Sequence, residues 1–230
     1  MKVLALNGSP RKAATAHVLG IFLEGMEEAG AEVELVRISK LDVKPCRGCF
    51  TCWTSTPGIC VQKDDMADML PKLDEADVIV LGTPVYVDGM TGIMKNFLDR
   101  MIPLDNGKVV IQDGHCRHPS RSGRDTIKIA LVSVCGFHEM DNFDPVVMHT
   151  RALCKNMNAE FVGAVLRPYA WALTALPSRG IDVSDVLEAI RDAGRQLVKK
   201  GEIKEATLDI ISKELIPKEI VAQVISSQFR

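Results

Sequence analysis

The strongest limit on the fold of this chain is set by two runs of almost unbroken apolar residues. They are DVIVLGT, from Asp77 to Thr83, and TIKIALVSV, from Thr126 to Val134. Runs this short and rich in Val, Ile and Leu indicate strands, and their continuity indicates burial on both faces. Such strands occur mainly in parallel sheets that helices cover on each side. The two runs therefore predict an α/β protein.

The rest of the chain alternates between strand and helix patterns over about 170 residues, which predicts an open parallel sheet with helices on both faces. We expect a doubly wound, five-stranded parallel sheet with right-handed crossovers and a ligand site beyond the carboxyl ends of its strands. The further strands are expected at 2–6, 32–38 and 160–166, and the helices at 15–30, from 64 onward, 91–101 and 145–157.

The length of 230 residues fits one large domain with an extension. We expect residues 1–180 to form the sheet domain and 181–230 to form a C-terminal helical extension, with one helix starting near Val183 and another over 218–224. Residues 106–123 are polar and predict an excursion that either covers the ligand or contacts another subunit.

The formal net charge of -2 gives no strong attraction to nucleic acid or to an anionic membrane. No apolar run approaches the roughly 20 residues that span a bilayer, and the N-terminal residues lack the pattern of a signal peptide. We therefore expect a cytoplasmic protein. In a reducing compartment, clustered cysteines indicate metal binding or catalysis rather than a disulfide framework.

The loop after the first strand has the composition of a phosphate site. Gly8 permits an unusual backbone angle, Ser9 and Thr15 offer hydroxyl groups, and Arg11 and Lys12 offer positive charge. The backbone N–H groups of the following helix would point into the same space. The loop has neither the Walker A nor the G-x-G-x-x-G spacing. The alternative is an ordinary turn with a Ser N-cap.

The loops after the third and fourth strands are expected at the same edge of the sheet. Thr83 to Gly89 reads TPVYVDG, in which Tyr86 either supplies a flat wall for a heteroaromatic ligand or simply packs. Ser133 to Glu139 reads SVCGFHE, with a turn at Gly136. We assign no chemical role to Cys135 or His138 as isolated residues.

In this order, the segments resemble the flavodoxin-like NADPH-dependent FMN reductase family. The resemblance rests on GSPRK (8–12) with Thr15, on TPVY (83–86) with the helix ending FLDR (97–100), and on CGF (135–137). It covers roughly the first 170 residues. It implies an FMN-dependent oxidoreductase that uses NAD(P)H or a soluble electron carrier and forms a homodimer or homotetramer.

The resemblance also implies which residues bind FMN. The phosphate would lie at Ser9, Arg11, Thr15 and the amides of Ala16 and His17. The isoalloxazine ring would lie along the loop from Pro84 to Asp88 (Pro84, Val85, Tyr86, Val87, Asp88) and near Cys135 and Gly136. Family members often have Asn or Ser where this chain has Ala13, Ala14 and Ala16, so backbone amides would bind more of the phosphate here.

Four cysteines, Cys46, Cys49, Cys52 and Cys60, have the spacing C-x2-C-x2-C-x7-C. The first three match a thiolate run that binds cubane clusters, and within the family the segment resembles the iron–sulfur flavoproteins. This resemblance implies a [4Fe-4S] cluster. Reduced thiols without a metal, a zinc site and a C-x-x-C disulfide remain alternatives. Phe50 and Trp53 would shield a cluster or simply pack.

Three functions are therefore open. The first is an FMN-dependent electron-transfer oxidoreductase with a [4Fe-4S] cluster. The second is an NAD(P)H-dependent FMN or quinone reductase without a cluster. The third is a non-enzymatic flavin-binding shuttle or sensor. We name no catalytic side chain, because a flavin carries out this chemistry itself.

Overall fold

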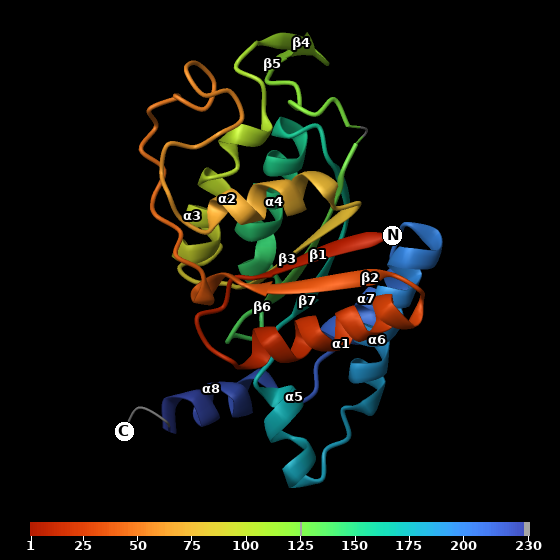
Figure 1. Cartoon of the computed structure of the whole chain (residues 1–230). Helices are drawn as coiled ribbons and strands as arrows, with labels where there is room; N and C mark the ends of the chain where they lie inside the picture. Colours follow the sequence, from red (N-terminus) through yellow and green to blue (C-terminus); the bar gives the residue numbers. More distant parts are fainter. Residues whose placement is uncertain (125, 228–230) are drawn as a thin grey trace.

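A computed structural model describes residues 1–124 and 126–227. Its main sheet has five parallel strands in the order β2-β1-β3-β6-β7 (Figure 1), which confirms the expected flavodoxin-like fold. Each strand lies within about two residues of its expected bounds. The strands are β1 (Lys2–Asn7), β2 (Glu32–Arg37), β3 (Val78–Pro84), β6 (Lys128–Val134) and β7 (Glu160–Arg167).

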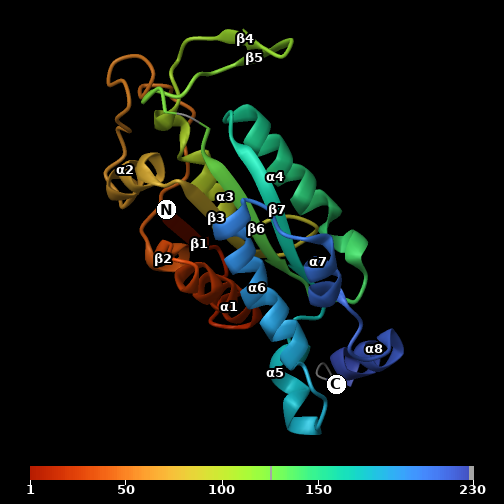
Figure 2. The same cartoon turned by 90° about the vertical axis from the view of Figure 1, so that its right-hand side faces the viewer.

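Helices cover both faces of the sheet (Figure 2). In β1, Val3 and Ala5 belong to the core beneath α1 and α6, whereas Leu4 and Leu6 belong to the core beneath α2, α3 and α4. This alternation explains why the strands are apolar throughout. The helices are α1 (Ala14–Glu28), α2 (Met66–Glu75), α3 (Gly92–Asp99), α4 (Asp144–Asn156), α5 (Ala172–Ala175), α6 (Ser184–Lys200), α7 (Glu205–Ser212) and α8 (Lys218–Ser227), with 3-10 turns at Ile38–Lys40, Ile102–Leu104, Met140–Phe143 and Pro177–Arg179.

The helices after residue 180 belong to the same core as α1. Val186, Ile190 and Leu197 of α6 are buried against it. The guanidinium of Arg167, at the end of β7, donates to the carbonyl oxygens of Ile211 and Lys213 at 2.7 and 2.9 Å. A domain boundary near residue 180 remains our proposal. Residues 228–230 of the expected C-terminal helical segment lie outside the described residues.

Residues 106–123 contain an antiparallel hairpin, which the sequence analysis treated only as a polar excursion. Its strands are β4 (Val110–Gln112) and β5 (His115–Arg117). Asp113 and Gly114 form the turn with φ angles of 49° and 75°. An Asp-Gly pair in this conformation is a strong hairpin signal. The hairpin lies beside the cysteine loop at the top of Figure 1.

No helix within the described residues is long and apolar enough to cross a membrane.

The contact between α1 and α6 depends on two glycines. A Cβ on Gly25 would lie 1.9 Å from the carbonyl oxygen of Arg191, and one on Gly194 would lie 2.1 Å from that of Phe22. The two backbones therefore touch at this point. Ion pairs between Arg191 and Glu24 and between Arg195 and Glu28, each at 2.7 Å, flank the contact.

We predict that Gly25→Ala destabilises the protein by about 2–3 kcal/mol, because the helices must separate to accept the methyl group. Gly20→Ala is the matched control in the same helix, since a Cβ there meets nothing within 4 Å. This control should stabilise by up to about 1 kcal/mol through helix propensity. Urea unfolding followed by circular dichroism measures both. Equal effects of the two variants would contradict the packing described here.

Candidate functional site

The loop between β1 and α1 is held by its own polar groups. The Ser9 N–H donates to Asn7 Oδ1 at 2.9 Å, and the Ser9 hydroxyl donates to the Arg11 carbonyl oxygen at 3.0 Å. Thr91, which caps the start of α3, donates from its hydroxyl to the Gly8 carbonyl oxygen at 2.7 Å. Because Thr91 follows the β3 loop, this bond fixes the first and third loops relative to each other.

The N-terminus of α1 is open to an anion. The N-cap residue Ala13 forms no side-chain capping bond within the described residues. The amides of the first helical turn, from Ala14 to Ala16, have no intrahelical partner and carry the positive end of the helix dipole. The His17 amide is different, since it donates to the Ala13 carbonyl oxygen at 3.1 Å within the helix.

The loop after β3 forms a tight turn at the edge of the sheet. The backbones of Tyr86 and Gly89 exchange two hydrogen bonds, at 2.9 and 3.2 Å. Between them, Val87 and Asp88 have φ angles of 48° and 60°, which an L-residue adopts at a cost in strain. Val87 is 99% exposed at the tip of this turn. The Val85 amide donates to the Val134 carbonyl oxygen at 2.8 Å, which joins this loop to β6.

The loop after β6 pairs with the segment after β7. The Cys135 thiol is buried and donates to the Phe137 carbonyl oxygen at 3.2 Å. Burial raises the pKa of this thiol, so it stays protonated at neutral pH. A protonated thiol is a poor nucleophile, which fits a wall residue better than a reactive one.

These three loops enclose a cavity of about 460 Å³, within the range typical of small-molecule sites. Every predicted cofactor residue lines it except Ala16 and His17. Its lining combines Ser9, Arg11 and the first residues of α1 with the turn from Pro84 to Asp88. This combination of residues suits a molecule with an anionic tail and a flat apolar body.

Six residues that line the cavity were absent from the predicted cofactor set: Ala13, Ala14, Val134, Phe137, Asn142 and Trp171. The indole Nε1–H of Trp171 is buried and has no hydrogen-bond partner within the described residues. A buried donor without a partner is costly, and an acceptor on a bound ligand would satisfy it. The sequence carries no local signal for Trp171, because it reaches the cavity from beyond β7.

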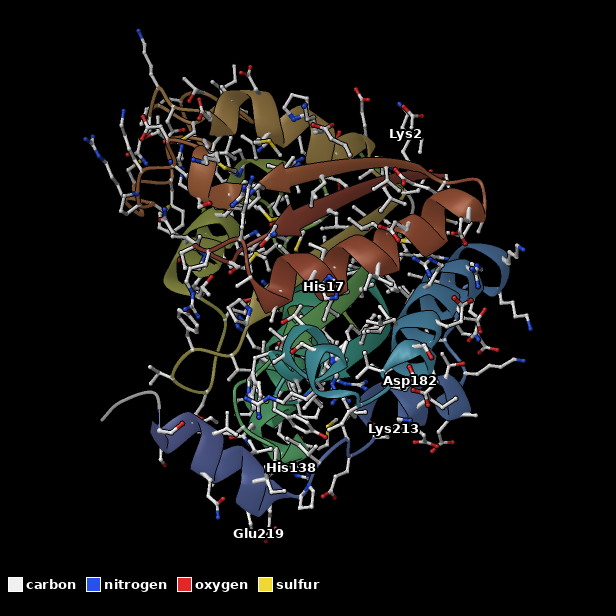
Figure 3. The ribbon with its side chains drawn as sticks, turned by 90° about the horizontal axis from the view of Figure 1, so that it is seen from below. Lys2, His17, His138, Asp182, Lys213 and Glu219 are labelled. Atoms are coloured by element: carbon white, nitrogen blue, oxygen red, sulfur yellow. The ribbon has the colours of Figure 1, made fainter. Side chains whose placement is uncertain are left out.

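The two labelled histidines in Figure 3 differ in their surroundings. His17 lies on α1, outside the cavity wall. His138 stacks on Tyr169 with ring centroids 5.0 Å apart, and its Nε2 lies 3.6 Å from a carboxylate oxygen of Glu214, near the start of α8. His138 therefore packs between the β6 loop and the C-terminal segment and does not line the cavity.

The four cysteines line a second, smaller cavity next to the C-terminal end of α3. Cys46 and Cys49 are exposed, Cys52 is buried and Cys60 is half-buried. The loop between them wraps the cavity through positive φ angles at Gly48 (62°), Phe50 (52°) and Gly58 (83°). This arrangement presents four sulfur donors to one enclosed space.

Hydrogen bonds reach three of these sulfurs. The Gly48 N–H donates to Cys46 Sγ at 3.4 Å, and the Thr51 hydroxyl donates to Cys49 Sγ at 3.3 Å. The bond from Thr51 lowers the pKa of Cys49, whereas burial raises the pKa of Cys52. Arg100 donates to Cys60 Sγ at 3.4 Å.

The spacing of the sulfurs bears on what they could bind. Within the described residues, no three His, Cys, Asp or Glu side chains are close enough to hold a single metal ion. A mononuclear zinc site needs convergent ligands, whereas a cubane cluster takes each thiolate on a separate iron. In the described residues the four sulfurs share the lining of one cavity but are not gathered around a single ion.

The 106–123 segment supports the cysteine loop and does not line the first cavity. The Trp53 ring stacks on Phe50 with centroids 5.1 Å apart and contacts the tilted His118 ring with centroids 4.3 Å apart. Its indole N–H donates to the Ile102 carbonyl oxygen at 3.1 Å. Arg121 donates to the Cys52 carbonyl oxygen at 3.3 Å. Phe50 lines the sulfur cavity, whereas Trp53 anchors the loop from outside it.

Comparison with known proteins agrees with this geometry. Residues 1–163 match the family model described as NADPH-dependent FMN reductase. An iron–sulfur flavoprotein of Archaeoglobus fulgidus is 33% identical over 226 residues, covering 94% of each chain. Another, from Methanocaldococcus jannaschii, is 37% identical over 108 residues, covering 46% of this chain and 55% of the relative.

Solved structures share the fold. An NAD(P)H:quinone oxidoreductase from Methanothermobacter marburgensis superimposes with a TM-score of 0.60 at 18% identity, over 86% of this chain and 98% of its own. The family model and the full-length relative together settle the assignment: the chain belongs to the NADPH-dependent FMN reductase family, as an oxidoreductase similar to the iron–sulfur flavoproteins.

Proposed function

We propose that this protein is an FMN-dependent oxidoreductase that accepts electrons from NAD(P)H and passes them through a [4Fe-4S] cluster to a soluble carrier. The observation that carries the flavin assignment is the cavity between the α1 N-terminus and the turn from Pro84 to Asp88. The family match independently supports FMN.

The residues of the first cavity fit FMN along its length. The open amides of the first α1 turn and the exposed Arg11 suit the phosphate. Tyr86 and Phe137 line the cavity and are 42% and 60% exposed, so solvent and a nicotinamide can reach this part of the wall. The unpartnered Trp171 Nε1–H suits a ring acceptor. Flavin supplies the conversion of a hydride into single electrons, so the chain itself needs only to bind and orient.

The cysteine cavity fits the cluster through its donor set. Cys46, Cys49, Cys52 and Cys60 provide one thiolate for each iron of a cubane. The name of the full-length relative, an iron–sulfur flavoprotein, supports the same group. The cavity lies at the end of α3 opposite the flavin loop, and the eight residues of α3 span about 12 Å. A one-electron acceptor here complements a flavin that can give up its electrons singly.

We also propose that the chain forms a homodimer or homotetramer in the cytoplasm. The hairpin exposes Val109, Val110 and Ile111 (57%, 42% and 81%), and the neighbouring cysteine loop exposes Ile59 and Val61 (67% and 47%). Exposed apolar patches of this kind mark contact surfaces. All seven cysteines are free, which suits a reducing compartment; cell fractionation tests the location.

Turnover tests the proposed function directly. The FMN-loaded protein should catalyse steady-state reduction of a dye by NADPH or NADH, and the apoprotein should not. Turnover with neither nicotinamide would contradict an NAD(P)H-dependent enzyme and favour the non-enzymatic shuttle.

A matched pair of variants tests the phosphate end of the same cavity. Arg11→Gln should weaken FMN binding about fivefold, roughly 1 kcal/mol, because it removes one charge-assisted contact, and should leave riboflavin binding unchanged. Lys12 is also exposed but does not line the cavity, so Lys12→Gln should change neither affinity. Flavin fluorescence quenching measures the dissociation constants of FMN and riboflavin for both variants. Equal losses for FMN and riboflavin in Arg11→Gln would place the phosphate elsewhere.

Iron analysis tests the cluster. Protein purified without oxygen should contain about four iron and four sulfide per chain. Cys49→Ala should lose most of the iron, whereas Cys116→Ser, on the exposed hairpin outside the cavity, should retain it. Wild-type protein that holds zinc or no metal would contradict the cluster and leave the flavin assignment intact.

Sedimentation equilibrium tests the subunit contact. The wild type should sediment as a dimer or tetramer, and Ile111→Asp should shift it toward monomer. Met148→Asp provides the control, because Met148 is 70% exposed on α4, away from the hairpin. A monomeric wild type, or equal effects of the two variants, would contradict this interface.

A further inference from the structure

A buried ion pair lies beside the cysteine loop, and the proposed electron-transfer function does not yet explain it. Arg100 follows α3 and is 2% exposed, and the paired side chains of Arg100 and Asp64 are 1% and 0% exposed. Arg100 Nη1 donates to Asp64 Oδ2 at 2.5 Å, and Nη2 donates to Oδ1 at 2.9 Å. A bidentate pair fixes the plane of the guanidinium as well as its position.

The remaining Nη hydrogens of Arg100 have defined partners. Nη1 also donates to the Lys44 carbonyl oxygen at 2.6 Å, which holds the start of the cysteine loop. Nη2 also donates to Cys60 Sγ at 3.4 Å. All four Nη–H groups of Arg100 therefore donate a hydrogen bond. The guanidinium cannot rotate away from Cys60 Sγ without breaking its ion pair with Asp64.

The ion pair presents its positive end to the sulfur cavity. Arg100 lines that cavity together with the four cysteines, whereas Asp64 does not. Backbone N–H groups of Lys44 and Met66 donate to the Asp64 carboxylate from the other side, at 3.0 and 3.2 Å. Asp64 thus balances the buried charge of Arg100 without offering an oxygen to the cavity.

Among the described residues, Cys60 is the one cavity sulfur that accepts a hydrogen bond from a cation. Cys46 and Cys49 accept from a neutral amide and a neutral hydroxyl. Arg47 also lines the cavity but is exposed, so water and salt screen its charge. The contact of Arg100 with Cys60 is buried and is screened much less.

We propose that Arg100 is a positioning residue for the cluster: it holds Cys60 at the cavity wall and raises the reduction potential of the cluster through its N–H···S bond. This inference rests on the proposed cluster. Reduction adds one electron to the iron–sulfur core, with no bond broken and no proton taken up. The added negative charge spreads onto the thiolates, so a cationic donor at Cys60 Sγ stabilises the reduced form more than the oxidised form.

An anaerobic redox titration of the holoprotein tests the inference, with the flavin in the same molecule as an internal reference. Removing Arg100 alone leaves the carboxylate of Asp64 buried without a partner, which is strongly destabilising. The principal variant is therefore the neutral double substitution Arg100→Gln with Asp64→Asn. Arg100→Lys keeps the charge without the planar fork, and Arg47→Gln is the matched control on the same cavity.

The double variant should lower the midpoint reduction potential of the cluster by about 59 mV. For a one-electron couple, this shift lowers the ratio of reduced to oxidised cluster about tenfold when the solution is held at the wild-type midpoint. The flavin couple should not move. Arg100→Lys should give a smaller fall, and the effect of Arg47→Gln should be small and should vanish in high salt. Loss of iron from a folded double variant that still binds FMN would support the positioning of Cys60 by Arg100.

Two results would overturn the inference. An unchanged cluster potential in the iron-loaded double variant would make the ion pair merely structural. Equal shifts of the cluster and flavin couples would show a global effect rather than one at Cys60. If the wild-type protein contains no iron, the proposed cluster is refuted before any variant is made, and the role of Arg100 is not the reason.

Discussion

The parallel register of β1, β3 and β6 is the constraint on which the proposed FMN cavity depends. Asn7 pairs with Gly82, and Thr83 pairs with Ser133, so these strands end at one edge of the sheet. The loops that follow are then joined by bonds from Thr91 to Gly8 and from Val85 to Val134. The cavity is thus enclosed by backbone that the sheet has already positioned, which limits the ordering needed when a ligand binds.

Helix α3 connects this edge to the cysteine loop. Thr91 caps its N-terminus beside the proposed FMN cavity, and Arg100 follows its C-terminus beside the cavity that the four cysteines line. The same short element therefore supports both candidate sites. A buried ion pair adds little to the stability of a loop, because the desolvation of both charges offsets their attraction. The position of Arg100 beside Cys60 therefore suggests that its positive charge also acts on the group that the sulfurs bind.

The sheet could be predicted from the sequence, because strand burial and the strand-loop-helix order are local signals. The family resemblance indicated most of the residues that line the first cavity, and their binding of FMN stays a prediction. Other features depend on contacts that no local pattern reports. Arg100 meets Asp64 across 36 residues, and Trp171 reaches the cavity from beyond β7. The hairpin does have a local signal, the Asp113-Gly114 turn. The segment around this turn is polar and lacks a strong strand alternation, so the sequence analysis did not predict its strands. Helix α7 (Glu205–Ser212) falls within the expected helical extension, but the sequence pattern did not separate it from its neighbours.

The central claim is that one chain holds a two-electron and a one-electron carrier. An anaerobic reductive titration with dithionite, followed by absorbance, counts the electrons that each chain accepts. A flavin and a [4Fe-4S] cluster together should accept about three, with the flavin and cluster bands bleaching at separate stages. An end point at about two electrons, with flavin bands alone, would contradict the claim.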